Sequence, residues 1–181
     1  MFEACLTINL NTCLHRKNQL NLSDIANKIN SITYNPHKFG AAVYRMQNPK
    51  ATFLLFSTGK FVCTGSTTIS AARDSAQQMI QHISLVYRTP LTLTLFTIRN
   101  IVVTINIGFP INLEQFYDSR RANCIYEQEF FPGLKFKPTT NESKTVLLFI
   151  SGKLVITGCK KEKEIPELAY YMKRILLKFK R

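Results

Sequence analysis

Acidic residues are scarce in this chain. Asp and Glu together number 11 against 24 Lys and Arg, so the formal net charge is +13 at pH 7. Both halves carry the excess, with +6 in residues 1–90 and +7 in residues 91–181. A basic surplus spread over the whole chain indicates an acidic partner that both halves contact, with nucleic acid as the first candidate. Charge that serves solubility alone is the alternative interpretation.

Sequence patterns typical of catalysis, metal binding and membrane insertion are also missing. The cysteines are odd in number and form no C-x-x-C pair, which argues against a zinc site and a disulfide framework. The three histidines have no acid or cysteine at a catalytic spacing, and no glycine-rich phosphate loop occurs. Neither a secretory signal nor an apolar run of about twenty residues is present. We therefore expect a non-enzymatic intracellular protein with no cofactor, no metal and no membrane partner.

One ten-residue stretch occurs twice, as FSTGKFVCTG at residues 56–65 and as FISGKLVITG at residues 149–158. In each copy two apolar runs flank a glycine followed by lysine, which predicts two strands joined by a tight hairpin. Similar residues extend the likeness in both directions. We therefore expect residues 1–90 to be the first repeat and residues 91–181 the second repeat of one structural domain, since each half leaves a sheet edge that the other can join.

Hydrophobic periodicity predicts alternating strands and helices in each half. In the first half it predicts strands over 3–10, 39–46, 51–56 and 60–64, a helix whose apolar positions run from 22 to 32, and a long helix over 69–86. In the second half it predicts strands over 91–107, after Pro132, over 144–150 and over 153–157, with helices over 112–117 and from about Pro166. Asn21 and Asn112 are candidate helix caps.

The paired strands are apolar on both faces, although two helices per half can cover only one. Leu54 and Val62 share one parity, whereas Phe53 and Phe61 share the other. A sheet with one solvated face should carry polar residues there, so an uncovered apolar face indicates a binding surface. Burial of that face by a partner subunit or a neighbouring sheet is the alternative.

Several short motifs, in this order and doubled, give the chain a family resemblance over nearly its whole length. They are YNPxKF at 34–39, FSxGKxVCTG at 56–65, NIV at 100–102, FPI at 109–111, FPGL at 131–134 and FxSGKxVxTG at 149–158. The chain resembles the conserved core of the TATA-binding protein family. The resemblance implies an α+β fold, a pseudo-symmetric duplicated saddle with a curved antiparallel sheet and helices on its convex face.

The implied function is that of a general transcription initiation factor. Such a protein binds and bends A·T-rich, TATA-like promoter DNA through the minor groove and nucleates assembly of the preinitiation complex. The implied location is the nucleus, or a viral replication site if the chain is virus-encoded. One alternative is a paralogue that acts mainly through protein contacts with weak or no sequence-specific DNA binding. Another is an RNA binder that uses the sheet as a stacking platform.

The resemblance also assigns roles to individual residues. DNA-intercalating wedges are implied for Phe39, Phe56, Phe131 and Phe149. Residues implied to line the minor groove are Leu54, Val62, Thr64, Asn100, Val102, Leu147, Val155 and Thr157. Cations implied to contact phosphates are Lys38, Arg45, Lys50, Lys60 and Lys153. For any single phenylalanine the alternative is packing in the core, and for any single cation the alternative is a solvated surface charge.

Protein partners are implied as well. A transcription factor IIB-like protein would dock on Glu127, Glu129 and Phe130, although an ordinary acidic loop is the alternative there. A transcription factor IIA-like protein and the RNA polymerase machinery are further candidate partners. The first repeat departs from the family, since aligning residues 7–10 with 104–107 puts Glu3 at the position of Asn100 and Cys5 at that of Val102.

Overall fold

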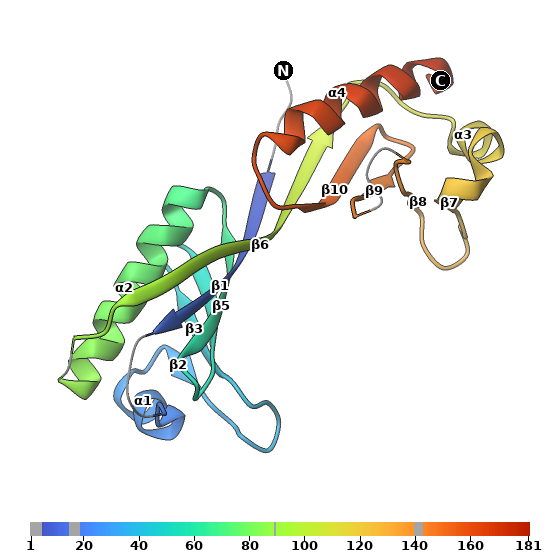
Figure 1. Ribbon diagram of the computed structural model, residues 1–181. Helices are drawn as coiled ribbons and strands as arrows, with labels where there is room; N and C mark the ends of the chain where they lie inside the picture. Colours follow the sequence, from blue (N-terminus) through green and yellow to red (C-terminus); the bar gives the residue numbers. More distant parts are fainter. Residues whose placement is uncertain (1–4, 15–18, 89, 140–142) are drawn as a thin grey trace. The chain divides into compact units, whose positions relative to one another are not determined.

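Two compact units make up the chain. The computed structural model describes residues 5–14, 19–88, 90–139 and 143–181, with the backbone alone for 5–14 (Figure 1). One unit is Thr7–Arg99, and the other is Asn100–Arg181 together with Cys5 and Leu6. Each unit combines an antiparallel sheet with helices, which confirms the predicted α+β class.

The sheet of the first unit has the strand order β2-β3-β4-β5-β1, and its neighbouring strands pair antiparallel. Its strands are β1 (Cys5–Leu14), β2 (Ile32–Thr33), β3 (Ala42–Met46), β4 (Ala51–Leu55) and β5 (Lys60–Ser66). The helices are α1 (Leu22–Lys28) and α2 (Ile69–Tyr87). Thr68 caps α2, because its hydroxyl accepts a hydrogen bond from the backbone N–H of Ala71 at 3.0 Å. The predicted long helix over 69–86 is confirmed.

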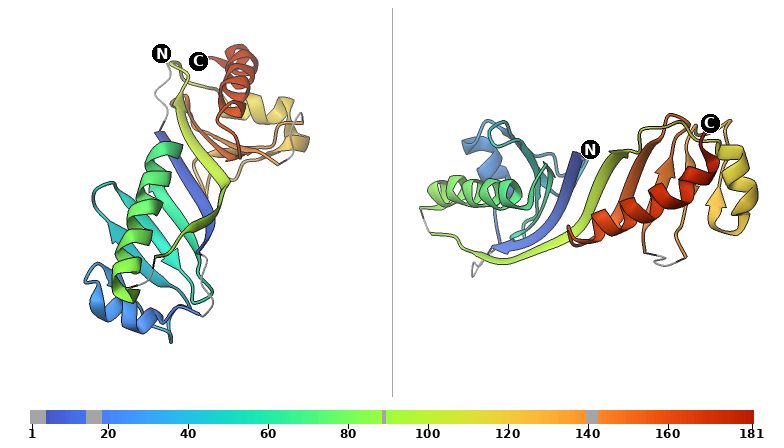
Figure 2. Two further views of the ribbon diagram at one scale, coloured as in Figure 1. Left: turned by 60° about the vertical axis from the view of Figure 1, so that its left-hand side comes forward. Right: turned by 90° about the horizontal axis from the view of Figure 1, so that it is seen from above.

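The core of the first unit lies between this sheet and α2, which runs along the strands in both views of Figure 2. Phe53 and Phe61 pack edge to face with their ring centroids 5.8 Å apart. Ala76, Met79 and Ile83 of α2 belong to the same buried cluster. Full burial of each large side chain contributes about 1.5–3 kcal/mol. This packing therefore fixes which face of the sheet is closed.

The predicted helix with apolar positions from 22 to 32 is too long. The helix α1 ends at Lys28, and the backbone of Ile29 is already extended, with φ −123° and ψ 103°. Ile32 pairs with Tyr44 in the sheet instead. A short helix is marginal by itself, so strand pairing and burial of Ile32 decide the conformation of this segment. Apolar residues at helical spacing fit both outcomes.

The sheet of the second unit has the order β6-β10-β9-β8-β7. Its strands are β6 (Leu93–Asn106), whose first part lies in the other unit, β7 (Cys124–Ile125), β8 (Leu134–Phe136), β9 (Thr145–Leu148) and β10 (Lys153–Cys159). The helices are α3 (Leu113–Ser119) and α4 (Glu164–Leu176), with short 3-10 turns η1 (Arg121–Asn123) and η2 (Leu177–Phe179). Pro166 lies in the first turn of α4, where its missing N–H is not needed.

The core of the second unit repeats the arrangement of the first. Leu168, Met172 and Leu176 of α4 are buried, as are the alternate residues of β6, β9 and β10. Phe116 of α3 packs edge to face against Phe136 at 5.3 Å and against Phe179 at 5.2 Å. The two predicted caps are also confirmed, since Asn21 and Asn112 each accept a hydrogen bond from the backbone N–H three residues on.

A partly buried ion pair joins the start of α4 to the sheet of the second unit. Lys144 is buried, and its Nζ lies 3.7 Å from Oε1 of Glu164. The other carboxylate oxygen accepts hydrogen bonds from the backbone N–H groups of Lys160 at 2.8 Å and Lys161 at 3.1 Å. These hydrogen bonds, helped by Lys144, hold the pKa of Glu164 below its ordinary value.

Candidate nucleic-acid interface

Matching turns hold Phe56 and Phe149 at the ends of their strands. In the first unit the N–H of Phe56 donates to the carbonyl of Lys60 at 2.9 Å, and the N–H of Gly59 donates back to Phe56 at 3.0 Å. The equivalent bonds of the second unit, around Phe149, measure 3.0 and 2.9 Å. Gly59 has φ 80° and Gly152 has φ 83°, a region that favours glycine. The hairpin predicted from the repeat is confirmed.

In the second unit the two predicted wedge residues form one packed pair. The rings of Phe131 and Phe149 meet edge to face, with centroids 5.9 Å apart and planes at 68°. Phe131 is 43% exposed although it is a large apolar side chain. Gly133 lies directly against both rings, since a Cβ built on it would come within 2.6 Å of Phe131 and 2.9 Å of Phe149.

In the first unit the corresponding pair is looser. Phe39 is 48% exposed and Phe56 is half-buried. Among the described residues, no ring contact joins the two. Gly40 follows Phe39 and has no atom within 4 Å of its built Cβ. The predicted strands 39–46 and 51–56 are therefore too long, because Phe39 and Phe56 lie in the turns that flank β3 and β4.

Along β4 and β5, and along β9 and β10, each sheet presents a row of half-buried apolar side chains. In the first unit Leu54 lies opposite Val62, and in the second Leu147 lies opposite Val155. The neighbouring row contains Thr64 in the first unit and Thr157 in the second. These side chains keep partial exposure while their neighbours along each strand are buried. The predicted contrast between a closed and an open apolar face is confirmed within each unit.

Asn100 extends this open face on β6, and its neighbours fix its amide. Its Oδ1 accepts a hydrogen bond from the backbone N–H of Gly158 at 2.8 Å, and its Nδ2 donates to the hydroxyl of Thr157 at 3.2 Å. The amide nitrogen carries two hydrogens, so one remains available to an external acceptor. Val102 follows on the same face and is half-buried.

The backbone register identifies the first-unit counterparts of these β6 residues. Asn11 lies opposite Val62 where β1 pairs with β5, and Thr104 lies opposite Val155 where β6 pairs with β10. Both ladders carry a register shift at the same place, one to three residues further toward the start of β1 and of β6. Equivalent positions in β1 and β6 are therefore 93 residues apart, as they are in the hairpins.

This register shows that the predicted alignment of the first strand is wrong. Asn100 corresponds to Thr7, and the residue two positions further on corresponds to Asn9. Glu3 lies outside the described residues, and Cys5 does not occupy the expected position. The alignment failed because alternating strands look alike after any even shift, so sequence likeness alone did not fix the register.

The predicted phosphate-contacting cations are all on the surface. Lys38, Arg45, Lys50, Lys60 and Lys153 are exposed. Among the described residues, the ion pairs are Lys28–Asp24, Arg121–Asp118 and Lys144–Glu164, so none of the five is neutralised by an acid. They remain available to an external anion.

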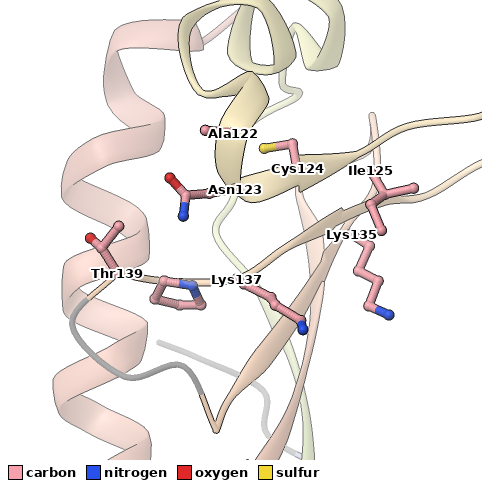
Figure 3. A pocket seen from close by; sticks show the side chains of 8 residues that line it. Ala122, Asn123, Cys124, Ile125, Lys135, Lys137 and Thr139 are labelled. Carbon is pink, nitrogen blue, oxygen red and sulfur yellow. The ribbon is translucent and has the colours of Figure 1, made fainter.

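Sequence reasoning could not place two further cations that lie beside the open face. Lys135 lies opposite Leu147, in the apolar row of the second unit. Lys135 and Lys137 also line a depression of about 470 Å³, and Figure 3 shows both side chains reaching toward the same side of β8. Alternation along the strand was the available signal, since both lysines alternate with buried Leu134 and Phe136.

The predicted partner-binding residues line a second depression, of about 620 Å³, in the second unit. Glu127, Glu129 and Phe130 contribute to it, and Phe130 is 83% exposed. Glu114 and Asp118 of α3 add two acids that sequence reasoning did not identify. Burial, and then the charge of nearby Glu114, raise the pKa of Tyr126 at its edge. The depression is therefore both acidic and partly apolar.

Reactive groups are not gathered at any of these surfaces. Burial raises the pKa of the Cys63 and Cys124 thiols to about 11, which keeps both protonated and unreactive at neutral pH. Within the described part of the chain, no three His, Cys, Asp or Glu side chains cluster as a metal site would require. None of its helices combines the length and apolar character needed to cross a membrane.

Comparison with known proteins identifies the fold and then the family. The solved structure of a Methanococcus jannaschii TBP superposes with a TM-score of 0.82 at 26% identity, covering 97% of this chain and 99% of that one. The fold is thus that of TATA-binding proteins.

The model of the family Transcription factor TFIID (or TATA-binding protein, TBP) matches twice, at residues 7–86 and 95–179. A TATA-box-binding protein of Dictyostelium discoideum is 37% identical over 177 residues, 96% of this chain and 83% of that protein. TATA-box-binding protein 2 of Entamoeba histolytica is 37% identical over 152 residues, 84% of this chain and 70% of that protein. The chain therefore belongs to the TATA-binding protein family, whose members are non-enzymatic transcription factors.

Proposed function

We propose that this protein binds and bends A·T-rich, TATA-like promoter DNA through the minor groove and so initiates transcription. The observation that carries the proposal is the open apolar face of each unit, bordered by a pair of phenylalanines in or beside its turns. Wedging apolar side chains into the minor groove is the known DNA-binding mode of this family, and the family is the standard example of that mode. We further propose that residues 1–90 and 91–181 are the two repeats.

The chemistry of the open faces supports this use. The minor groove of A·T pairs shows only acceptors and lacks the protruding amino group of guanine. The half-buried side chains of Leu54 and Val62 in one unit, and of Leu147 and Val155 in the other, fit such a groove without requiring polar partners. Asn100 supplies a donor whose orientation is already fixed. Discrimination then comes from fit and DNA deformability more than from a base code.

The phenylalanine wedges and the cations contribute to the free energy of DNA binding in different ways. Unstacking a base step costs a few kcal/mol, which the burial of Phe39 with Phe56 and of Phe131 with Phe149 offsets. The five exposed cations, joined by Lys135 and Lys137, neutralise phosphates and release counterions, so affinity should fall steeply as salt rises.

The acidic depression of the second unit supports a role in assembly. We propose that a transcription factor IIB-like protein docks there, with Phe130 as the apolar anchor and Glu127 and Glu129 as charge partners. A transcription factor IIA-like protein and the RNA polymerase machinery would follow in the preinitiation complex. The nucleus, or a viral replication site for a virus-encoded chain, is the location that this role requires.

A fluorescence-transfer bending assay tests the proposal. An end-labelled TATA-like duplex should bend, a G·C-rich duplex should not, and added salt should weaken binding. The double variant Phe131→Ala with Phe149→Ala should lose most bending and keep its fold, because both rings are partly exposed. Phe130→Ala is the matched control, since this adjacent residue lines the acidic depression and its loss should leave bending unchanged.

Two outcomes would contradict the proposal. Unchanged bending by the double variant would remove these phenylalanines from the mechanism. Salt-sensitive binding to both duplexes without bending would favour the alternative, a paralogue that acts mainly through protein contacts. The acidic depression with exposed Phe130 is the observation that keeps this alternative in consideration.

A further inference from the structure

The outer side of the last helix carries a continuous exposed stripe. Its members recur every three or four residues along α4 and into η2, so they lie on one side of the helix. They are Lys163, Glu167, Tyr170, Arg174 and Leu177, which we call the α4 stripe. All five are exposed, and the two apolar members are unusually so, with Tyr170 at 71% and Leu177 at 53%.

The opposite side of α4 anchors the helix to its own unit. Leu168, Ala169, Met172 and Leu176 are buried there, and the right view of Figure 2 shows α4 lying across the strands. Because packing already fixes the helix through this side, the α4 stripe makes no contribution to the core. Its side chains face solvent on a rigid support.

The repeat supplies an internal comparison. Residues 160–181 contain eight cations and three acids, a net charge of +5, whereas the equivalent residues 67–88 contain two cations and one acid, a net charge of +1. The positions of α2 that correspond to the α4 stripe hold Ser70, Asp74, Gln77, Gln81 and Ser84.

The buried sides of the two helices match much better than their exposed sides. Ala76 and Met79 of α2 correspond to Ala169 and Met172 of α4, and all four are buried. The exposed side of α2 is polar and nearly neutral, and the helix packs equally well, so packing does not require a charged outer side. Neither the cations nor the exposed Tyr170 of α4 are needed for packing.

The two cations of the α4 stripe, Lys163 and Arg174, have no ion-pair partner among the described residues. Lys178, one turn beyond Arg174, is exposed as well. An arginine beside an exposed tyrosine and leucine has the composition of a binding hot spot, where aromatic and arginine side chains dominate the energy.

We propose that the α4 stripe docks an acidic amphipathic segment of another protein. Carboxylates of the segment pair with Lys163 and Arg174, and its apolar side chains cover Tyr170 and Leu177. A nucleic-acid backbone fits less well, because it would leave both apolar side chains uncovered and would approach the carboxylate of Glu167. The proposal does not depend on the DNA-binding role of the open sheet faces.

Fluorescence anisotropy with the full chain tests the proposal. The probe is a labelled acidic peptide of about twenty residues with Leu and Phe at helical spacing, and a scrambled peptide of equal composition is its control. The double variant Tyr170→Ala with Arg174→Glu should weaken binding by about tenfold or more. The matched variant Gln77→Ala with Gln81→Glu, at the equivalent positions of α2, should change affinity by less than about threefold.

Three results would overturn the proposal. They are the absence of peptide binding, equal binding of the scrambled peptide, and equal losses of affinity from the α2 and α4 variants. A short duplex DNA serves as a third probe. If the α4 variant weakens binding of the duplex and not of the peptide, the stripe serves nucleic acid. Thermal unfolding should be unchanged in both double variants, because every substituted side chain is exposed or only partly buried.

Discussion

Replacing Gly133 by alanine should disturb the wedge of the second unit without removing either ring. The built Cβ lies 2.6 Å from Cε1 of Phe131, 2.9 Å from Cε1 of Phe149 and 3.2 Å from Cζ of Phe149. Ordinary contacts of a Cβ begin near 3.4 Å. The rings must therefore move away from the strand or from each other, so the edge-to-face pair with its 5.9 Å spacing is displaced or opened.

The expected magnitudes follow from what the rings can do. Overpacking of this kind costs about 1–3 kcal/mol of folding stability, and the exposure of Phe131 places the cost at the lower end. Burial of a phenylalanine contributes about 1.5–3 kcal/mol, so a wedge that keeps half of it loses about 1 kcal/mol of binding. That loss corresponds to roughly fivefold weaker affinity for a TATA-like duplex.

The assay combines duplex bending by fluorescence transfer with thermal unfolding. Gly40→Ala is the matched control, because Gly40 follows the equivalent Phe39 and has no atom within 4 Å of its built Cβ. It should leave bending and affinity unchanged. Normal bending by Gly133→Ala, or equal losses from the two variants, would refute the idea that this glycine sets the wedge geometry.

Two further predictions concern stability. Gly152→Ala places a Cβ against the carbonyl oxygen of Phe109 at φ 83°, so it should lower the free energy of unfolding, measured in urea, by about 2 kcal/mol or more. Gly108→Ala is the control, because Gly108 has φ 84° but no atom near its built Cβ, so it should cost only the roughly 1–2 kcal/mol of backbone strain. Equal costs for the two variants would contradict the clash. The pKa of Glu164 is lowered by two backbone N–H groups and by Lys144, so the ionised carboxylate stabilises the fold above pH 4.5, and this stabilisation is lost as the pH drops through the native pKa. Glu164→Gln should therefore make the free energy of unfolding less dependent on pH in the acid range. An unchanged pH profile would contradict the assignment.

Local sequence signals were sufficient wherever a short stretch fixes its own conformation. The hairpins around Gly59 and Gly152 follow from glycine and the flanking apolar runs, and both have the expected left-handed glycine. Asn21 and Asn112 cap their helices because an asparagine side chain reaches the N–H three residues on, whatever the rest of the fold does.

Prediction failed where two long-range outcomes share one local pattern. Ile32 has helical spacing from Ile29, yet it pairs in the sheet because Tyr44 lies opposite. The first strand resembles β6 at more than one even shift, and only its pairing with β5 aligned Asn100 with Thr7. Lys135 could not be placed because the segment from Phe131 to Phe149 is one residue longer than that from Phe39 to Phe56, and its pairing opposite Leu147 put it on the open face.

The sequence by itself determined the duplication, the α+β class, the family and the two-faced apolar character of the strands, because all of these are written in periodicity and in motifs a few residues long. Only the tertiary structure decided which side chains contact one another. It brought Phe131 against Phe149 over Gly133, joined Asn100 to Gly158, and gathered the acids of α3 around Phe130. These contacts join residues distant in sequence, so their geometry depends on strand register and helix packing, which no local pattern encodes.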